Sequence, residues 1–205
     1  MQRLLIATSN PGKLRELKRF LSDLPLELVG LQDLQITEKA PETGATFEEN
    51  AILKAEFYAL KSGLPALADD GGFEIDALNG EPGVKSHRWV DPSKENDDET
   101  LINFSLKRLA TTPLTKRGAQ LRLVLALVLP SGQSFTTTDV QRGIVPIAAS
   151  PKREHGFPYR SLLFFPKINK YYIDVSTSEM EEYNHRKRAV AKMKGIIRKK
   201  VLFQL

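Results

Sequence analysis

The sequence predicts a single α/β domain, and three observations lead to that prediction. A short apolar run at residues 3–7 is followed by a polar turn and then by leucines at helical spacing, which is typical of a strand that leads into a helix. Residues 46–63 form the clearest helix of the chain, and residues 119–129 alternate with period two, as a half-buried strand does. At 205 residues the chain has the size of one domain, with room for two lobes around a cleft.

The first half of the chain reads as alternating strands and helices. We expect strands at 3–7 and 26–31, a helix over 14–24 between them, and a polar loop at 37–45. The helix over 46–63 begins with Thr46 and Glu49, which are spaced as a capping box, and ends near Gly63. Residues 66–80, "ALADDGGFEIDALNG", indicate a strand, an acidic turn and a second strand.

The second half of the chain contains a predicted hairpin and two predicted helices. Residues 96–110 have helical spacing, and the strand at 119–129 is followed by the turn "PSGQ" and a returning strand, which predicts a long antiparallel hairpin. The segment "PKREHGFPYRS", residues 151–161, has two prolines and one glycine and reads as a loop. A strand at 161–165 and a last helix over 185–200 complete the prediction.

Composition excludes several classes of protein. No run approaches the roughly 18 apolar residues of a membrane span, the N-terminus lacks a signal-peptide pattern, and the absence of cysteine excludes disulfides and fits a reducing cytoplasm. The net charge is +5, but residues 186–200 hold eight positive charges and no acid, so the remainder carries −3 (+5 minus 8). We interpret this basic segment as a solvated helix face, and attraction to phosphate or nucleic acid is the alternative.

The turn "TSNPGK", Thr8 to Lys13, is a candidate phosphate site. A glycine-containing turn between a strand and a helix presents free backbone N–H groups, and the helix dipole adds positive potential. The dipole disfavours a cation such as Lys13 in the first turn, unless an anion docks beside it. An ordinary helix N-terminus is the alternative, because the spacing is not that of a Walker loop.

Carboxylates and a lysine form a second candidate site. Asp69 and Asp70 directly follow an apolar run, where adjacent carboxylates suit a hard cation such as Mg²⁺, and a plain acidic turn is the alternative. Lys54 lies one turn from Asn50 on a largely apolar helix face, so it either reaches out to solvent or belongs to a polar seam that faces a cleft. Glu42, in the loop before, is a further candidate carboxylate.

His185 and Arg186 open the last helix, where they can bind phosphate or the edge of a base, with simple surface polarity as the alternative. The candidates together comprise a phosphate cradle, a carboxylate cluster for a metal and a second cationic set. That combination is typical of a nucleotide phosphohydrolase, in which electrostatic stabilisation and an activated water do the chemistry.

Five segments of the sequence resemble the inosine triphosphate pyrophosphatase family, hydrolases of non-standard purine nucleoside triphosphates. In family order they are "LLIATSNPGKLRELKRFL", "ETGATFEENAILKA", "LPALADDGGFEIDALNGEPGVKSHRW", "HGFPYRSLLFFP" and "NHRKRAV". The resemblance implies an elongated, two-lobed α/β fold with a long curved mixed sheet flanked by helices, and a substrate cleft between the lobes. It also implies a cytoplasmic homodimer that uses Mg²⁺ to cleave a nucleoside triphosphate into monophosphate and pyrophosphate.

The resemblance also assigns roles to residues at matching positions. It implies that Glu42 and Asp70 bind the metal, with Asp69 as a candidate further ligand, and that Asp70 also activates the water. Lys54 would hold phosphate. The remaining substrate-binding residues implied by the match are Thr8, Ser9, Asn10, Pro11, Gly12 and Lys13 at the triphosphate, Gly71 beside the metal site, and Phe157, Tyr159, Arg160, His185 and Arg186 around the base.

The chain departs from the family pattern mainly around the predicted base site. Gly71 replaces a serine, Pro158 a glycine, Arg160 an aspartate and Asn184 a serine, while Met180 stands near the position of a lysine. Because arginine only donates hydrogen bonds, Arg160 should favour acceptor-rich edges or phosphate. We therefore expect an active enzyme with altered base preference.

Two other readings stay open. The first is a degenerate homologue that binds a nucleotide without cleaving it. The second is nucleic-acid binding through residues 185–200, which the lack of interleaved aromatic residues in that segment argues against.

Overall fold

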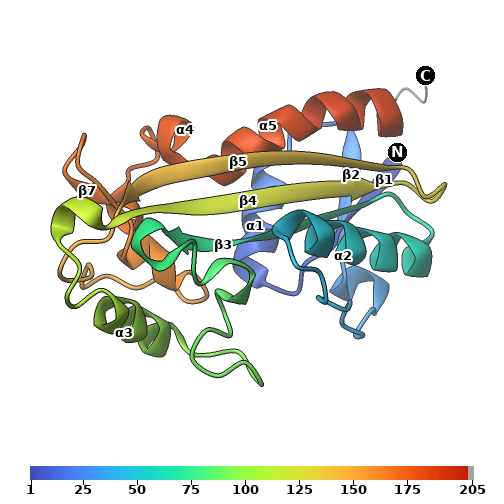
Figure 1. The fold of residues 1–205 in the computed structure, drawn as a ribbon. Helices are drawn as coiled ribbons and strands as arrows, with labels where there is room; N and C mark the ends of the chain where they lie inside the picture. Colours follow the sequence, from blue (N-terminus) through green and yellow to red (C-terminus); the bar gives the residue numbers. More distant parts are fainter. Residues whose placement is uncertain (203–205) are drawn as a thin grey trace. The chain divides into compact units, whose positions relative to one another are not determined.

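A seven-stranded sheet runs through the protein, whose structure is a computed structural model that describes residues 1–202 apart from the side chain of Glu181. The strand order is β2-β1-β3-β4-β5-β6-β7 (Figure 1). The strands are β1 (Gln2–Ile6), β2 (Leu26–Gly30), β3 (Ala66–Ile75), β4 (Gly118–Val128), β5 (Ser134–Ile144), β6 (Phe164–Phe165) and β7 (Lys170–Tyr171).

The sheet is mixed, and helices flank it. β1 pairs in parallel with both β2 and β3, whereas β6 pairs antiparallel with β5 and with β7. β4 and β5 are neighbours joined by a tight turn, in which the Leu129 N–H donates to the Gln133 carbonyl at 2.9 Å, so the predicted hairpin is confirmed. The predicted α/β class with a mixed sheet is likewise confirmed. The helices are α1 (Pro11–Phe20), α2 (Phe47–Ser62), α3 (Asp98–Arg108), α4 (Met180–Tyr183) and α5 (His185–Ile197).

Contacts divide the chain into two compact units. Unit 1 comprises residues 1–70, 123–139 and 186 onward, and unit 2 comprises residues 71–122 and 140–185. None of the helices in the described part of the chain is long and apolar enough to cross a membrane.

In unit 1, apolar side chains pack against both faces of the strands. Ile6 and Leu125 face a cluster to which α1 and α5 contribute, and the adjacent Leu5 and Val124 face a second cluster to which α2 contributes. The alternation follows from the two-residue period of a strand. It places α1 and α5 over one face of the strands and α2 over the other.

In unit 2, a single cluster joins β3, α3 and the segment after β5. Phe73 stacks on Tyr159 with ring centroids 4.7 Å apart, and Ile102, Leu163 and Tyr172 complete its centre. Burying this apolar surface stabilises the unit and fixes the path of residues 158–163.

The structure corrects two predicted elements. Residues 66–80 were predicted as a strand, an acidic turn and a second strand, but residues 66–75 form one continuous strand, β3. Lysines pair with Asp69 and Asp70, so the two carboxylates are accommodated within the strand. Gly72 packs against Ser86, where a Cβ would lie 2.2 Å from the hydroxyl oxygen. The predicted strand at 161–165 shrinks to β6, because residues 158–161 form a 3₁₀ turn.

Other expected elements agree with the structure. α2 has the predicted capping box between Thr46 and Glu49, and Gly63 ends it at a φ of 67°, which suits glycine. α5 ends at Ile197 and continues as a π-helical turn over Arg198–Leu202.

Candidate active site

The N-terminus of α1 is capped by its own side chains. Asn10 Oδ1 accepts from the N–H groups of Gly12 at 2.8 Å and Lys13 at 3.2 Å, and Thr8 Oγ1 accepts from the Asn10 N–H at 3.2 Å. Pro11 has no N–H to offer. The prediction that this turn presents free backbone N–H groups is therefore wrong for Gly12 and Lys13, and the positive end of the helix dipole is what remains.

Lys13 and Arg186 both bind the buried carboxylate of Asp69. The Lys13 Nζ lies 3.1 Å from Asp69 Oδ2, and Arg186 Nη2 lies 3.2 Å from the same oxygen. Arg186 also pairs with Glu16 at 2.6 Å. Asp69 is thus the anion that makes a lysine acceptable in the first turn of α1.

Opposing effects set the ionisation of Asp69. Burial raises its pKa, but the charges of Lys13, Arg186 and Lys54 outweigh burial and hold the pKa well below the usual range. Its Oδ1 atom is buried and makes no hydrogen bond within the described part of the chain. Asp69 therefore carries a full negative charge, with one oxygen available to a water or a cation.

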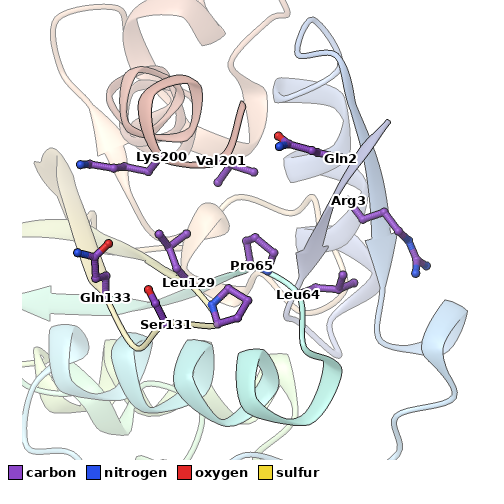
Figure 2. A pocket seen from close by; sticks show the side chains of 10 residues that line it. Gln2, Arg3, Leu64, Pro65, Leu129, Ser131, Gln133, Lys200 and Val201 are labelled. Carbon is purple, nitrogen blue, oxygen red and sulfur yellow. The ribbon is translucent and has the colours of Figure 1, made fainter. Parts of the chain in front are cut away.

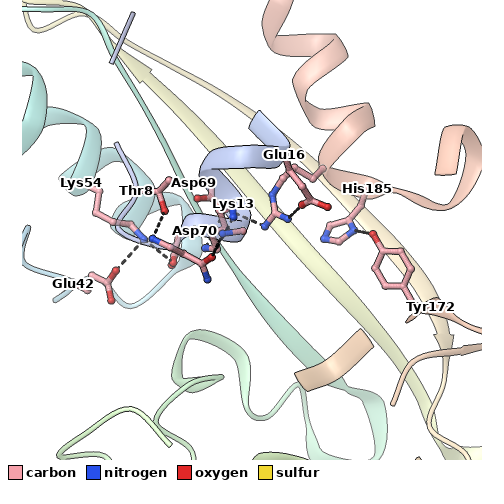
Figure 3. A network of polar contacts seen from close by, with 12 residues as sticks. Thr8, Lys13, Glu16, Glu42, Lys54, Asp69, Asp70, Tyr172 and His185 are labelled. Carbon is pink, nitrogen blue, oxygen red and sulfur yellow. Dashed lines mark hydrogen bonds and ion pairs between the residues drawn. The ribbon is translucent and has the colours of Figure 1, made fainter. Parts of the chain in front are cut away.

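Lys54 brings Asp70 and Glu42 together. The Lys54 Nζ lies 3.0 Å from Asp70 Oδ1 and 3.0 Å from Glu42 Oε1 (Figure 3). Burial lowers the pKa of Lys54, but Asp70, Asp69 and Glu42 together raise it above the usual value, so the ammonium stays protonated. Burial raises the pKa of Asp70, and Lys54 only partly offsets this effect.

The donor set can be compared with the needs of Mg²⁺. Among residues 1–202, Glu181 aside, no group of three or more His, Asp or Glu side chains could hold a metal ion. Mg²⁺ in nucleotide sites requires only one or two carboxylates, because waters and phosphate oxygens complete its shell. Glu42 and Asp70, which share one ammonium, supply two carboxylates and fit that requirement.

The segment 151–161 belongs to unit 2, and its cations are paired there. Arg160 binds Glu154 at 2.8 Å and lies over the Phe157 ring, 4.0 Å from its centroid. Lys152 binds Asp174 at 2.7 Å, and Arg153 binds Glu99. The segment is therefore an exposed loop over its first residues that ends in a buried 3₁₀ turn at Pro158–Ser161.

Comparisons with known proteins identify the family of the chain. The model of the Ham1 family matches residues 4–196. The chain belongs to the Ham1 family. A dITP/XTP pyrophosphatase of Mannheimia succiniciproducens is 39% identical over 196 residues, 95% of this chain and 97% of the relative. One of Geobacter sulfurreducens is 39% identical over 95% of this chain and 96% of the relative.

Solved structures of Ham1 proteins share the fold. A HAM1 protein from Coxiella burnetii matches with a TM-score of 0.85 at 30% identity, over 96% of this chain and 98% of the other. The Ham1 protein of Staphylococcus aureus matches with a TM-score of 0.81 at 32% identity, over the same shares. The predicted family resemblance is confirmed by all three comparisons, and the predicted fold class by these structures.

The predicted site residues of this Ham1 chain fall into two groups. Unit 1 holds Thr8, Asn10, Lys13, Glu42, Lys54, Asp69, Asp70 and Arg186, together with the intervening turn residues Ser9, Pro11 and Gly12. Unit 2 holds Gly71, Phe157, Tyr159, Arg160 and His185. Arg186, which was expected near the base, bonds to Asp69 in unit 1 together with Lys13.

Two residues that were predicted to contact the base are buried and interact with other side chains or backbone groups of unit 2. Tyr159 is buried, its hydroxyl donates to the Ser86 carbonyl at 2.6 Å, and burial raises its pKa. His185 is buried too, with Nδ1 3.3 Å from the Tyr172 hydroxyl. Their contact with a base stays a prediction.

Four cations of the basic C-terminal segment share two acidic partners within unit 1. Arg188 and Lys192 bind Asp139 at 2.7 and 2.8 Å, and Lys194 and Arg198 bind Asp23 at 2.7 and 3.5 Å. These ion pairs attach α5 to β5 and to the segment after α1. They argue against the reading of this helix as a nucleic-acid surface.

Three residues that support the candidate site were not predicted as site residues from the sequence. Glu16 holds Arg186, and the side chains of Asn50 and Tyr58 bind the segment that carries Glu42. The four-residue spacing of Asn50, Lys54 and Tyr58 was the available signal.

Proposed function

We propose that this chain is a nucleoside triphosphate pyrophosphatase, which converts a nucleoside triphosphate and water into a monophosphate and pyrophosphate. The observation that supports it most is the cluster in unit 1, where two lysines, an arginine and three acidic residues meet beside the N-terminus of α1. The dITP/XTP pyrophosphatases named above are similar over nearly the whole chain. Non-standard purine nucleotides are therefore the first substrates to test.

Lys13, Arg186 and the positive end of α1 would bind the phosphates. Both side chains already contact Asp69, so a phosphate oxygen would share cations that are held in place and largely desolvated. Charge-assisted bonds from such pre-positioned donors favour the charge that develops on the leaving pyrophosphate.

Glu42 and Asp70 would hold a Mg²⁺ ion, with Asp69 contributing directly or through a water. When bound, the ion would neutralise phosphate charge. Lys54 would orient both carboxylates and reach a phosphate oxygen, because its ammonium lies between them.

Asp70 would accept the proton of the attacking water. Burial has raised its pKa, which makes the carboxylate a better base than a solvated aspartate. The water supplies OH to one product and its proton to Asp70, and the bond between the α and β phosphates breaks.

The base preference is proposed to differ from that of the relatives. Arg160 is a donor where the family has an acceptor, and Glu154 holds its guanidinium over Phe157. A polar group changed at a base edge alters discrimination strongly.

The test is pyrophosphate release from a panel of nucleotides with Mg²⁺, including dITP, XTP and the standard nucleotides. Release from at least one supports the proposal. Tight binding of a triphosphate that stays intact would instead favour the degenerate binder, and neither binding nor turnover in a folded sample would reject both.

The homodimer, the cytoplasmic location and the single two-lobed domain are proposals of the same kind. Their support is the family membership of the chain. Sedimentation velocity tests the dimer directly, and a monomer at micromolar concentration would reject it.

A further inference from the structure

Glu42 lies in a segment without regular structure, yet one stripe of α2 runs beside it. Asn50, Lys54 and Tyr58 follow one another at four-residue intervals on α2, so their side chains lie along one face of the helix. Asn50 and Tyr58 are buried, each with 5% of its surface exposed. Buried polar groups of this kind need fixed partners.

The partners are backbone groups on both sides of Glu42. The Tyr58 hydroxyl donates to the Glu38 carbonyl at 3.1 Å and accepts from the Ala40 N–H at 3.3 Å. Asn50 Oδ1 accepts from the Gly44 N–H at 2.8 Å. The segment therefore runs antiparallel to α2 and is held at its two ends.

Lys54 lies between these two anchors on the helix, as Glu42 does on the segment. Their ion pair of 3.0 Å closes the arrangement in its middle. The helix thus sets the position of the Glu42 carboxylate relative to Lys54, and through Lys54 relative to Asp70.

Close packing against α2 requires a glycine at position 44. A Cβ at this position would lie 2.6 Å from the Cβ of Glu49 and 2.9 Å from Asn50 Oδ1. The Glu49 carboxylate also accepts from the Ala45 N–H at 2.6 Å. Only a residue without a side chain allows the backbone to approach α2 so closely.

We propose that Asn50 and Tyr58 are positioning residues, which hold Glu42 where it can bind the divalent cation. The inference rests on the proposed function insofar as Glu42 is a metal ligand. Without these anchors, Glu42 would be an exposed side chain on an irregular segment. Metal binding would then have to order this segment, and the entropy cost would weaken the affinity for the metal.

The experiment measures Mn²⁺ binding to the nucleotide-free protein by electron paramagnetic resonance. Tyr58→Phe and Asn50→Ala should each weaken binding by about 10-fold to 100-fold, the range found when supporting hydrogen bonds of metal ligands are removed. Turnover of Tyr58→Phe should recover at saturating metal, which a general loss of structure would not allow.

Matched controls make the same chemical changes in unit 2. Tyr171→Phe removes a hydroxyl that donates to the Ala148 carbonyl at 2.8 Å, and Asn96→Ala removes an amide that accepts from the Val90 N–H at 2.9 Å. Both should bind Mn²⁺ as the wild type does. Equal losses in the controls, or no loss in either folded variant, would overturn the inference.

Two further readouts separate this inference from the proposed function. Glu42→Gln should weaken Mn²⁺ binding; if it does not, the metal assignment itself fails. Hydrogen exchange of the Gly44 amide should accelerate in Asn50→Ala, and that of Ala40 in Tyr58→Phe, whatever the metal does. Unchanged exchange at both amides would reject the anchors while leaving the metal assignment intact.

Discussion

Asp69→Asn should destabilise unit 1 and change its response to acid. Asp69 is almost fully buried, with a side chain 1% exposed, and binds Lys13 and Arg186. Removing one partner of a buried ion pair leaves uncompensated charge and costs about 3–5 kcal/mol. Glu16 still neutralises part of Arg186 at 2.6 Å, so we expect a loss near the lower end, about 3 kcal/mol of the free energy of unfolding.

The pH dependence of this effect has a definite sign. The pKa of Asp69 is lowered on folding below the ordinary aspartate value of about 3.9, so its stabilisation is fully present well above that value. The stabilisation fades as the pH falls below that value towards the folded pKa. The difference between wild type and Asp69→Asn should therefore shrink in acid.

Urea denaturation at pH 7 and at pH 3.5 measures both quantities, with Asp23→Asn as the control. Asp23 also has two cationic partners, Lys194 and Arg198, but its side chain is 54% exposed. Exposed pairs contribute less than about 1 kcal/mol. An Asp69→Asn loss at pH 7 no larger than that of Asp23→Asn would refute the reasoning.

Three other substitutions probe the site and its surroundings. Asp70→Asn should abolish turnover, and unchanged kcat would contradict the role of Asp70 as base. Burial raises the pKa of Asp70, so the stability that this group adds belongs to its protonated form and is lost as the pH rises above the ordinary range of an aspartate. The urea midpoint of the variant at pH 7 should therefore be unchanged or higher. Arg160→Asp should shift the ratio of kcat/KM values towards dITP and XTP by at least about tenfold, roughly one hydrogen bond, and an unchanged ratio would mean that residue 160 does not face the base. Gly72→Ala should lower the free energy of unfolding by about 1–3 kcal/mol, because the new Cβ would lie 2.2 Å from the Ser86 hydroxyl oxygen; an unaltered thermal midpoint would contradict that packing.

Local signals in the sequence predicted the elements that local physics decides. Thr46, Glu49 and Gly63 mark the ends of α2 because caps are interactions within four residues. Alternating leucines identified β4 in the same way. β3 was divided wrongly because "DDGG" has the composition of a turn, and the cations that hold Asp69 in a strand come from distant positions, such as Arg186, 117 residues away.

In the candidate site, too, the sequence predicted residue types but not the contacts that tertiary packing creates. Residue types and motifs identified Lys13, Glu42, Lys54 and Asp70, and the structure brings them into one unit. Sequence spacing gave no sign that Arg186 binds Asp69, since tertiary packing of α5 decides that contact. Nor did it show that acidic residues such as Asp139 pair with cations of the basic helix.

One cavity of unit 1 is lined by none of the candidate site residues. It has a volume of about 620 Å³ and is lined by Gln2, Arg3, Leu64, Pro65, Leu129, Pro130, Ser131, Gln133, Lys200 and Val201 (Figure 2). The charged ends of Arg3 and Lys200 point away from one another there. Without converging polar groups, the cavity offers no recognisable ligand chemistry.

Product analysis tests the central claim most directly. A purified sample is incubated with Mg²⁺ and the best nucleotide of the panel, and monophosphate, diphosphate, pyrophosphate and orthophosphate are quantified by chromatography. The proposed function predicts one pyrophosphate for each monophosphate, with no turnover in Asp70→Asn. Release of orthophosphate with a diphosphate, or no product from any nucleotide, would contradict it.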